Sequence, residues 1–592
     1  MKKFFLYITL FFSLLVCAQN EQLAQHYFDK GDFEKALISY QELVKSQPNN
    51  WVFLQKTVEC YQQLKQFDKA ENAIQEQLNK YRQASSLVEL GYNFQLQKDD
   101  AKANKYYEQA LDRIKKNTSE VYGVAAAFEK KVLVDLALQA YEMANAIDPK
   151  FNFNFQIAIL YGQKGNTDKM IEKFLEESFT NKQNLYIIQN QLSRFLSEDN
   201  NLAFNESLRK ALILQSQKSQ DIFWNQFLSW FYVQQKEYGK AFVQEKAIYK
   251  RNPETFSNIV NLGKMAIDED IQDAASEILT FVLENTQDMN LQIQARFYLM
   301  EMKINSGLEA TFPAIETELD QLIKQYGIGP NTLELQILQA HFLTFKRNNP
   351  EAGKTILKKA LELPLNPYQA ADAKMELADI FLFEEKFNQA LLYYSQIEED
   401  IKNDVIGHEA SLKAAKTSYF KADFVWAQKQ FKELKSASTQ LIANDALEYF
   451  LLINDNTAAD STLTALKDFS RADYLLYQNK NQEALTQFQK ILTNYKGNEI
   501  ESITCYRLGK TFEKLGDYQS ALSQYKTIID QHEDGIYIDE ALYFSAEIYN
   551  KKLIDVEKAK ALYEQIVFHH EDSIYFIDSR KKFRQLRGDT NL

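Results

Sequence analysis

The chain has 592 residues and a formal net charge of −13 at pH 7. This length argues against a single hydrophobic core, and the negative charge argues against binding to nucleic acid or to anionic membranes. Only 8 prolines and 17 glycines occur in the chain. Because both residues interrupt regular structure, their scarcity favours long runs of helix.

The N-terminus has the pattern of an export signal. Lys2 and Lys3 precede an apolar run, Phe4–Ala18, which is shorter than the roughly 20 residues that a membrane-spanning helix needs. We therefore predict a signal peptide over residues 1–18 and a mature protein in the periplasm or on the periplasmic face of the outer membrane. The segment also resembles a bacterial lipoprotein leader in which Cys17 is acylated, although Val16 stands where that family has a small residue. No later apolar run is long enough to span a membrane.

A phrase recurs along the rest of the chain: KGDFEKALISYQELV near the start returns as LGDYQSALSQYKTII from Leu515. The residue that aligns these copies is small in almost every case. It is found at Ala36, Ala70, Ala103, Ala137, Met170, Ala203, Ala241, Ala275, Ala314, Ala352, Ala390, Ala427, Ala484, Ala521 and Ala559. Such periodicity predicts units of two amphipathic helices that must stack to bury their apolar faces.

The last clear unit shows the expected chemistry. Helix A covers ESITCYRLGKTFEKL, a turn follows at Gly516, and helix B is YQSALSQYKTIIDQH. We expect Gly509 and Ala521 to face one another, because small side chains let two helix axes approach closely. Tyr525 is expected to fill the space beside them.

The pattern of small and aromatic residues at these positions resembles the tetratricopeptide repeat. The resemblance implies an all-α fold, a right-handed superhelical solenoid of helix-turn-helix repeats. It weakens near residues 185–220, 285–335 and 435–470, where polar residues occupy key positions. The residues that define the repeat are Gly31, Ala36, Ala70, Ala103, Ala137, Ala241, Ala390, Gly509, Gly516 and Ala521.

The repeat length divides the chain. Intervals of 33 or 34 residues predict an N-terminal solenoid segment over 19–215, and intervals of mostly 37–39 predict a C-terminal segment over 216–592 that ends in a basic helix. The acidic connectors that begin at His532 and His569 resemble those of bacterial envelope repeat proteins. That resemblance implies a protein–protein interaction scaffold in the cell envelope or, alternatively, an accessory subunit of an outer-membrane assembly or secretion machine.

No residue pattern indicates catalysis. The sequence has no glycine-rich phosphate loop, no HExxH and no CxxC, so we predict no cofactor, no metal site and no enzymatic activity. The adjacent residues of His569–Asp572 diverge on a helix and cannot easily converge on one ion. Cys60 and Cys505 are expected to be isolated reduced thiols.

Two sets of side chains are candidates for a groove that holds a partner. The tetratricopeptide family places groove residues on helix A, which implies the aromatic residues Tyr92, Tyr122, Phe155 and Trp230; the alternative is that they pack as core. The family's carboxylate clamp is absent from the first repeats, where Gln25, Gln55 and Glu59 occupy its positions.

The second set is basic and lies in the C-terminal segment. These side chains would form a cationic stripe for an acidic segment or a free carboxylate, unless they are paired with neighbouring carboxylates. The residues are Lys413, Lys416, Arg507, Lys510, Lys514, Arg580, Arg584 and Arg587.

Overall fold

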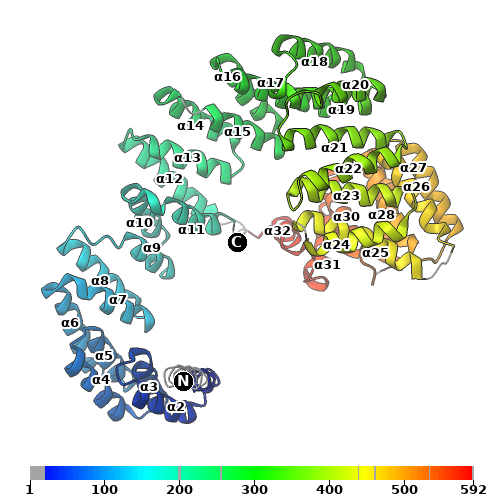
Figure 1. Ribbon diagram of the computed structural model, residues 1–592. Helices are drawn as coiled ribbons and strands as arrows, with labels where there is room; N and C mark the ends of the chain where they lie inside the picture. Colours follow the sequence, from blue (N-terminus) through cyan, green and yellow to red (C-terminus); the bar gives the residue numbers. More distant parts are fainter. Residues whose placement is uncertain are drawn as a thin grey trace, which may run out of the picture. The chain divides into compact units, whose positions relative to one another are not determined.

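The computed structural model describes residues 20–197, 202–253, 256–437, 439–458, 462–532 and 534–589. The predicted signal peptide, with Cys17, lies outside the described residues. Throughout the described ranges the regular elements are helices, and helices adjacent in sequence pack as pairs (Figure 1). The expected all-α solenoid of helix-turn-helix repeats is confirmed. None of the described helices combines the length and the apolar character that crossing a membrane requires.

The chain forms two compact units, which meet between residues 227 and 228 within α13 (Ile222–Gln234). The first unit opens with a helix over residues 20–29. Its further helices are α2 (Phe33–Ser46), α3 (Trp51–Gln63), α4 (Phe67–Tyr81), α5 (Ser85–Leu96), α6 (Asp100–Lys116), α7 (Val121–Lys130), α8 (Val134–Ile147), α9 (Asn154–Gln163), α10 (Thr167–Thr180), α11 (Leu185–Ser197) and α12 (Leu202–Lys218). The segment boundary expected after residue 215 falls within α12.

The second unit continues the same arrangement. Its helices are α14 (Tyr238–Arg251), α15 (Phe256–Asp268), α16 (Gln272–Asn285), α17 (Met289–Ser306), α18 (Phe312–Tyr326), α19 (Leu333–His341), α20 (Pro350–Ala360), α21 (Pro367–Phe383), α22 (Phe387–Asp400), α23 (Val405–Phe420), α24 (Phe424–Ala437), α25 (Gln440–Ala458), α26 (Thr464–Tyr477), α27 (Asn481–Asn494), α28 (Ile500–Lys514), α29 (Tyr518–Gln531), α30 (Ile538–Ile548), α31 (Val556–His569) and α32 (Phe576–Arg587). Single π turns follow α19 and α30.

The aligned small residue lies near the start of helix B in each pair and is buried in most of them. Ala36, Ala70, Ala137, Ala241 and Ala521 each have 0% of their surface exposed. The alignment is wrong by one position where the repeat is weak: Ala203 and Ala314 are exposed, and the next residues, Phe204 and Ile315, are buried instead. Larger side chains at the close approach of the two helices explain why the motif is faint there.

Gly509 faces a ring rather than an alanine. A Cβ atom built on Gly509 would lie 2.4 Å from Cε1 of Tyr525, so the expectation that Gly509 faces Ala521 is wrong. The same arrangement occurs in the first unit, where a Cβ on Gly91 would lie 2.3 Å from Cε1 of Tyr107. Glycine on helix A therefore makes room for the aromatic residue that follows the small residue of helix B by four positions.

The hydroxyl of that aromatic residue is bonded to helix A of the same repeat. Tyr141 donates to Oε1 of Glu129 at 2.5 Å, and Tyr525 donates to Oε1 of Glu513 at 2.5 Å. Tyr394 donates in the same way to Asp379. Since a buried hydroxyl needs a partner, each such bond fixes the register of the two helices in its pair.

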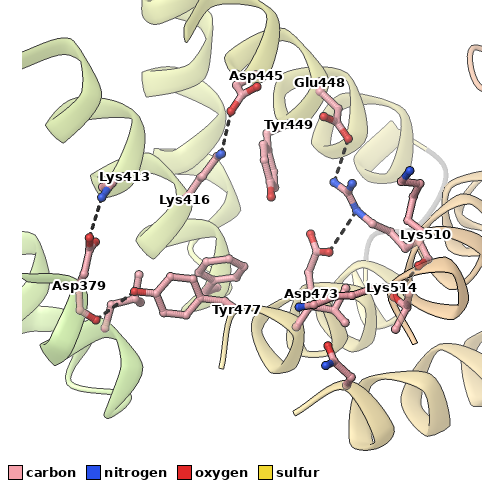
Figure 2. A pocket seen from close by; sticks show the side chains of 16 residues that line it. Asp379, Lys413, Lys416, Asp445, Glu448, Tyr449, Asp473, Tyr477, Lys510 and Lys514 are labelled. Carbon is pink, nitrogen blue, oxygen red and sulfur yellow. Dashed lines mark hydrogen bonds and ion pairs between the residues drawn. The ribbon is translucent and has the colours of Figure 1, made fainter. Parts of the chain in front are cut away.

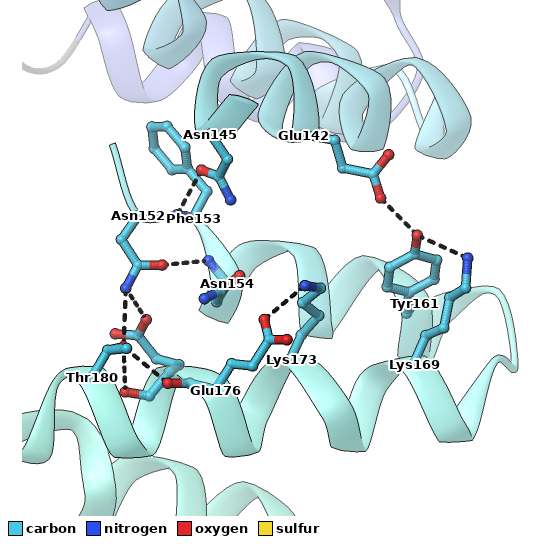
Figure 3. A network of polar contacts seen from close by, with 11 residues as sticks. Glu142, Asn145, Asn152, Phe153, Asn154, Tyr161, Lys169, Lys173, Glu176 and Thr180 are labelled. Carbon is cyan, nitrogen blue, oxygen red and sulfur yellow. Dashed lines mark hydrogen bonds and ion pairs between the residues drawn. The ribbon is translucent and has the colours of Figure 1, made fainter. Parts of the chain in front are cut away.

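The connectors between pairs are held by side chains. Asn152, which lies between α8 and α9, donates to Oε2 of Glu177 at 2.5 Å and accepts from the backbone N–H of Asn154 at 3.1 Å (Figure 3). Oδ1 of Asn145 accepts from the backbone N–H of Phe153 at 3.2 Å. The non-helical connector is thereby bonded to both α8 and α10, and the backbone N–H groups of Phe153 and Asn154 are satisfied.

The turn between helices A and B uses a residue in the left-handed region. Gly31 and Gly516 take this conformation with φ of 76° and 79°, but Val132 also takes it with φ of 57°. A β-branched residue is strained there, at a cost of roughly 1–2 kcal/mol. The side chain of Val132 is 77% exposed, so it gains little from packing.

We expect Val132→Asn to raise the free energy of unfolding of the first unit by about 1 kcal/mol, because asparagine tolerates the left-handed conformation. Val132→Thr keeps the β-branch and is the matched control. Urea unfolding measures both variants. An equal change in the two would show that backbone strain is not the cause.

The two described cysteines are unpaired and buried, with Cys60 0% and Cys505 1% exposed. Burial raises the pKa of each thiol to about 12. In a chain that begins at Gln19 we therefore expect neither thiol to react with Ellman's reagent within minutes at pH 8, and both to react in denaturant, because the thiolate is the reactive form. Prompt reaction of the folded protein would contradict this burial.

An extra helix interrupts the pairing in the second unit. The step of 57 residues from Ala427 to Ala484 contains α25, which packs on α24 without opening a pair of its own. The weak repeat near 435–470 is therefore this additional helix followed by the start of the next pair.

Candidate functional site

The clearest candidate site is a pocket of about 600 Å³ in the second unit (Figure 2). Four of the helices that line it, α21, α23, α26 and α28, are the first helices of their pairs, and α25 adds a further wall. The lining residues are Asp379, Leu382, Lys413, Lys416, Phe420, Asp445, Glu448, Tyr449, Asp473, Leu476, Tyr477, Asn481, Arg507, Lys510, Thr511 and Lys514.

The convergence of these helices depends on α26. Tyr474 donates to the backbone carbonyl of Leu382 at 2.5 Å, and Tyr477 donates to that of Asp379 at 3.0 Å. The side chain of Gln478 donates to the carbonyl of Phe383 at 2.8 Å. The C-terminal end of α26 is thus bonded to carbonyl groups of the last turns of α21, which lie more than 90 residues earlier.

Ion pairs between helices surround the pocket. Nζ of Lys413 lies 2.6 Å from Asp379, and Nζ of Lys416 lies 3.0 Å from Asp445. These contacts join α23 to α21 on one side and to α25 on the other. They neutralise the two lysines that α23 contributes.

Arg507 holds two carboxylates together. Its guanidinium lies 2.8 Å from Glu448 on α25 and 3.2 Å from Asp473 on α26. Burial alone would lower the pKa of Arg507, but the two carboxylates outweigh it and raise that pKa well above its usual value. Arg507 therefore keeps its charge and links three helices.

Asp473 is the most deeply buried charged residue of the lining. It is 6% exposed, its Oδ1 faces Arg507, and its Oδ2 has no hydrogen-bond partner. Burial raises the pKa of Asp473, and the charge of Arg507 opposes that rise. The lining thus contains an acceptor that lacks a donor.

The apolar part of the wall is aromatic. Tyr449 stacks on Phe431 with the ring centroids 5.3 Å apart, and Nζ of Lys416 lies 5.1 Å from the centroid of Tyr449. The Phe420 and Tyr477 rings lie 5.9 Å apart. The pocket offers both flat apolar surface and charged groups, which suits a peptide better than a purely apolar ligand.

The structure brings five of the predicted basic residues to this one pocket: Lys413, Lys416, Arg507, Lys510 and Lys514. The expectation of an unpaired cationic stripe is wrong for four of the five residues, because Lys413, Lys416, Arg507 and Lys510 are each paired with a carboxylate. Arg580, Arg584 and Arg587 lie on α32 and do not line the pocket, and Arg587 pairs with Asp589.

The predicted aromatic residues do not form one groove. Tyr92, Tyr122 and Phe155 lie in the first unit, whereas Trp230 lies in the second. Of these four residues, only Tyr122 is exposed, at 61%, and the other three are half-buried. Tyr92 lies beneath Nζ of Lys131 at 4.7 Å, and Phe155 packs on Phe174 at 5.7 Å, so the alternative of packing within the core fits these two better.

Sequence reasoning missed the acidic half of the pocket. Asp379, Asp445, Glu448 and Asp473 each lie on an otherwise ordinary amphipathic helix. The sequence signal for an extra wall of the pocket was the 57-residue interval from Ala427 to Ala484. This interval is about 20 residues longer than its neighbours, which leaves room for one more helix.

The histidine-rich connector shows no metal-binding geometry. In the described part of the chain no three His, Cys, Asp or Glu side chains are grouped so that they could hold an ion. Nδ1 of His570 lies 2.8 Å from Oδ1 of Asp539, so the two acidic connectors are paired with each other.

Glu540 follows Asp539 on α30 and has no partner for its buried Oε2. Burial, helped by the charges of Asp539 and Glu448, raises its pKa from 4.5 to about 7. The stability that follows from this shift is present below pH 4.5 and is lost as the pH rises through about 7, because the folded state binds the proton more tightly.

We expect Glu540→Gln to raise the free energy of unfolding of the second unit by about 1–3 kcal/mol at pH 8 and to change it little at pH 4.5. Urea unfolding at the two pH values measures the difference. Glu483→Gln, at an exposed position of α27, is the control and should have the same effect at both. A gain for Glu540→Gln that does not depend on pH would contradict the assignment.

Comparison with known families matches two parts of the chain. Residues 20–136 match the TT21 fifth ARM repeats domain, and residues 506–534 match the tetratricopeptide repeat. These two segments are thus similar to known helical repeats, in agreement with the paired helices of the fold. The second match covers the C-terminal part of α28 and all of α29, the pair that carries Gly509 and Tyr525.

One curated protein is similar to a short part of the chain, and two solved structures cover most of it at low sequence identity. The BBSome complex member BBS4 of Bos taurus is 33% identical over 103 residues, which are 17% of this chain and 20% of BBS4. The structure of Naa15/Naa10 bound to HypK-THB is 12% identical with a TM-score of 0.29, covering 97% of this chain and 94% of that one. The APC/C hetero-tetramer Cut9–Hcn1 is 13% identical with a TM-score of 0.25, covering 95% of each chain.

Proposed function

We propose that the protein is a non-catalytic scaffold of the bacterial cell envelope that holds a peptide or a partner protein against the first helices of its repeats. The observation that carries the proposal is the pocket between α21, α23, α25, α26 and α28. Its aromatic and charged lining comes from consecutive pairs, so a ligand there would contact several repeats at once. Repeat proteins of this kind use such extended surfaces for binding.

A non-catalytic role for the pocket is supported by the ion pairs that its charged side chains form. Lys413, Lys416 and Arg507 are engaged in ion pairs between helices. An active site would instead present a nucleophile or a base in hydrogen-bond reach of an open position. We therefore assign the pocket to recognition rather than to catalysis, with no cofactor.

The envelope location is supported by residues 1–18, with their basic start and apolar run. Cys17 supports a second form of the proposal, in which the protein is a lipid-anchored accessory subunit of an outer-membrane assembly or secretion machine. The intact mass of the mature protein distinguishes the two. A chain that starts at Gln19 supports the free scaffold, and a diacylglycerol-modified Cys17 supports the anchored subunit.

The scaffold proposal is tested by affinity purification from envelope extracts of the native host, after mild crosslinking. We expect at least one protein to be recovered in a fixed ratio to the scaffold. Recovery of no partner under conditions that preserve the fold would contradict it.

A further inference from the structure

We infer that the pocket between α21 and α28 binds an acidic peptide segment, with a backbone N–H at Asp473 and its carboxylates at Lys510 and Lys514. This inference rests on the proposed function and names the chemistry of the partner.

The two ends of the pocket differ in how their charges are satisfied. At the α23 end, Lys413 and Lys416 are each matched by a carboxylate on a neighbouring helix. At the α28 end, Lys514 donates only to the amide oxygen of Asn479, at 3.3 Å, among its contacts with described residues. Lys514 is exposed. The positive charge that is left over therefore lies at the α28 end.

Lys510 lies one turn from Lys514 on the same helix, so the two side chains share a face. Its partner is Glu513 at 3.2 Å, a residue that also accepts the buried hydroxyl of Tyr525. Lys510 is bound through Oε2 and the tyrosine through Oε1, and Nζ of Lys510 also lies 3.6 Å from the centroid of Phe544. Lys510 and Lys514 together suit a carboxylate of the ligand.

The second requirement comes from Asp473. Its Oδ2 is a buried acceptor without a donor, and leaving such an acceptor unsatisfied costs free energy. A ligand that carries an N–H group would relieve this cost. A peptide backbone supplies such a donor at every residue except proline, and its acidic side chains supply the carboxylates, so one ligand class satisfies both ends.

The aromatic wall sets the remaining preference. Phe420, Tyr449 and Tyr477 line the pocket, and Figure 2 shows Tyr449 and Tyr477 between its two charged ends. An apolar side chain between the acidic residues of the ligand would pack on these rings. We therefore expect a segment in which an aromatic residue lies between acidic residues.

The test uses fluorescence polarisation with the full mature chain and a labelled peptide, acetyl-Gly-Glu-Glu-Phe-Glu-Gly-amide. The capped ends exclude binding through a terminal carboxylate. The comparison peptide has glutamine in place of each glutamate. We expect the acidic peptide to bind roughly tenfold more tightly than the neutral one, with an advantage that shrinks at high salt.

Two matched double variants locate the binding. Lys510→Gln with Lys514→Gln removes the two pocket cations, while Lys490→Gln with Lys526→Gln removes two exposed cations outside the pocket and changes the net charge equally. We expect the first pair to weaken the acidic peptide about tenfold and the second to leave it unchanged. Hydrogen exchange confirms that both remain folded.

Asp473→Asn tests the buried acceptor. Because its amide nitrogen cannot face Arg507, the oxygen stays there and an N–H group turns to the pocket. We expect both peptides to bind about fivefold more weakly.

Three results would overturn the inference: equal binding of the two peptides, equal binding by the two double variants, or heparin binding with the same dependence on Lys510 and Lys514, which would indicate a site for any polyanion. A partner recovered equally well with both double variants would retain the scaffold and reject this site. Absence of any partner would instead reject the scaffold.

Discussion

We expect Arg507→Met to lower the free energy of unfolding of the second unit by about 3–5 kcal/mol at pH 8, because it leaves a buried carboxylate without its counter-charge. Asp473 is 6% exposed and has no other cation at salt-bridge distance among the described residues. Glu448, with 34% of its side chain exposed, can turn to solvent and contributes less. Urea unfolding, followed by the fluorescence of the second unit, measures the loss.

The pH dependence of this variant identifies the cause. Burial already raises the pKa of Asp473, and loss of the guanidinium charge raises it further. A carboxyl group with a raised pKa destabilises the folded state increasingly as the pH rises, so the defect should shrink as the pH falls. The double variant Arg507→Met with Asp473→Asn should recover most of the stability.

Lys526→Met provides the control, since it breaks an ion pair whose side chains are 73% and 50% exposed. Such a pair contributes roughly 0–1 kcal/mol. A similar loss in both lysine and arginine variants, or no recovery in the double variant, would contradict the role of Arg507.

The second large effect is expected at Gly509. A leucine there places its Cβ about where the Tyr525 ring lies, at 2.4 Å from Cε1, and overpacking of this kind costs roughly 1–3 kcal/mol. Because each repeat contacts mainly its neighbours, the damage should stay local. We expect hydrogen exchange to accelerate in α28, α29, α30 and α31.

Two comparisons make that prediction specific. Exchange in residues 20–197 of the first unit should be unchanged, and uniform loosening of the chain would contradict the repeat architecture. Gly239→Ala is the matched control, because a Cβ on Gly239 meets no atom within 4 Å. It should leave exchange unaffected in α28 to α31.

Much of the fold could be predicted because the same steric requirement recurs in successive helix pairs. Ala36, Ala137 and Ala521 are small for the same reason, namely that helix B passes close to helix A, and the chain repeats that requirement in each pair. Where the approach is filled by Phe204 or Ile315, the signal disappears although the pair forms. The small residue in the sequence therefore marks a close approach of the two helices, and a repeat without that close approach lacks it.

The candidate site was predictable only in part. Lys413 and Lys416 on one helix, and Arg507, Lys510 and Lys514 on another, could be assigned to common faces from their spacing. That the two faces meet depends on α25 and on the bond from Tyr474 to Leu382. Both are long-range features, and nothing in the local pattern around Tyr474 distinguishes it from a core tyrosine. Pairing of the cations with carboxylates was an alternative from the sequence, but the particular carboxylates could not be identified for the same reason.

The most direct test of the scaffold and its pocket is site-specific photocrosslinking in the native host. p-Benzoylphenylalanine replaces Asn481, which lines the pocket, and in a matched strain it replaces Lys526, which is exposed on α29. Our account predicts a discrete crosslinked partner at residue 481 that is absent at residue 526 and is lost when Lys510 and Lys514 are both changed to glutamine. Absence of a crosslink at residue 481, or the same products at both positions, would contradict it.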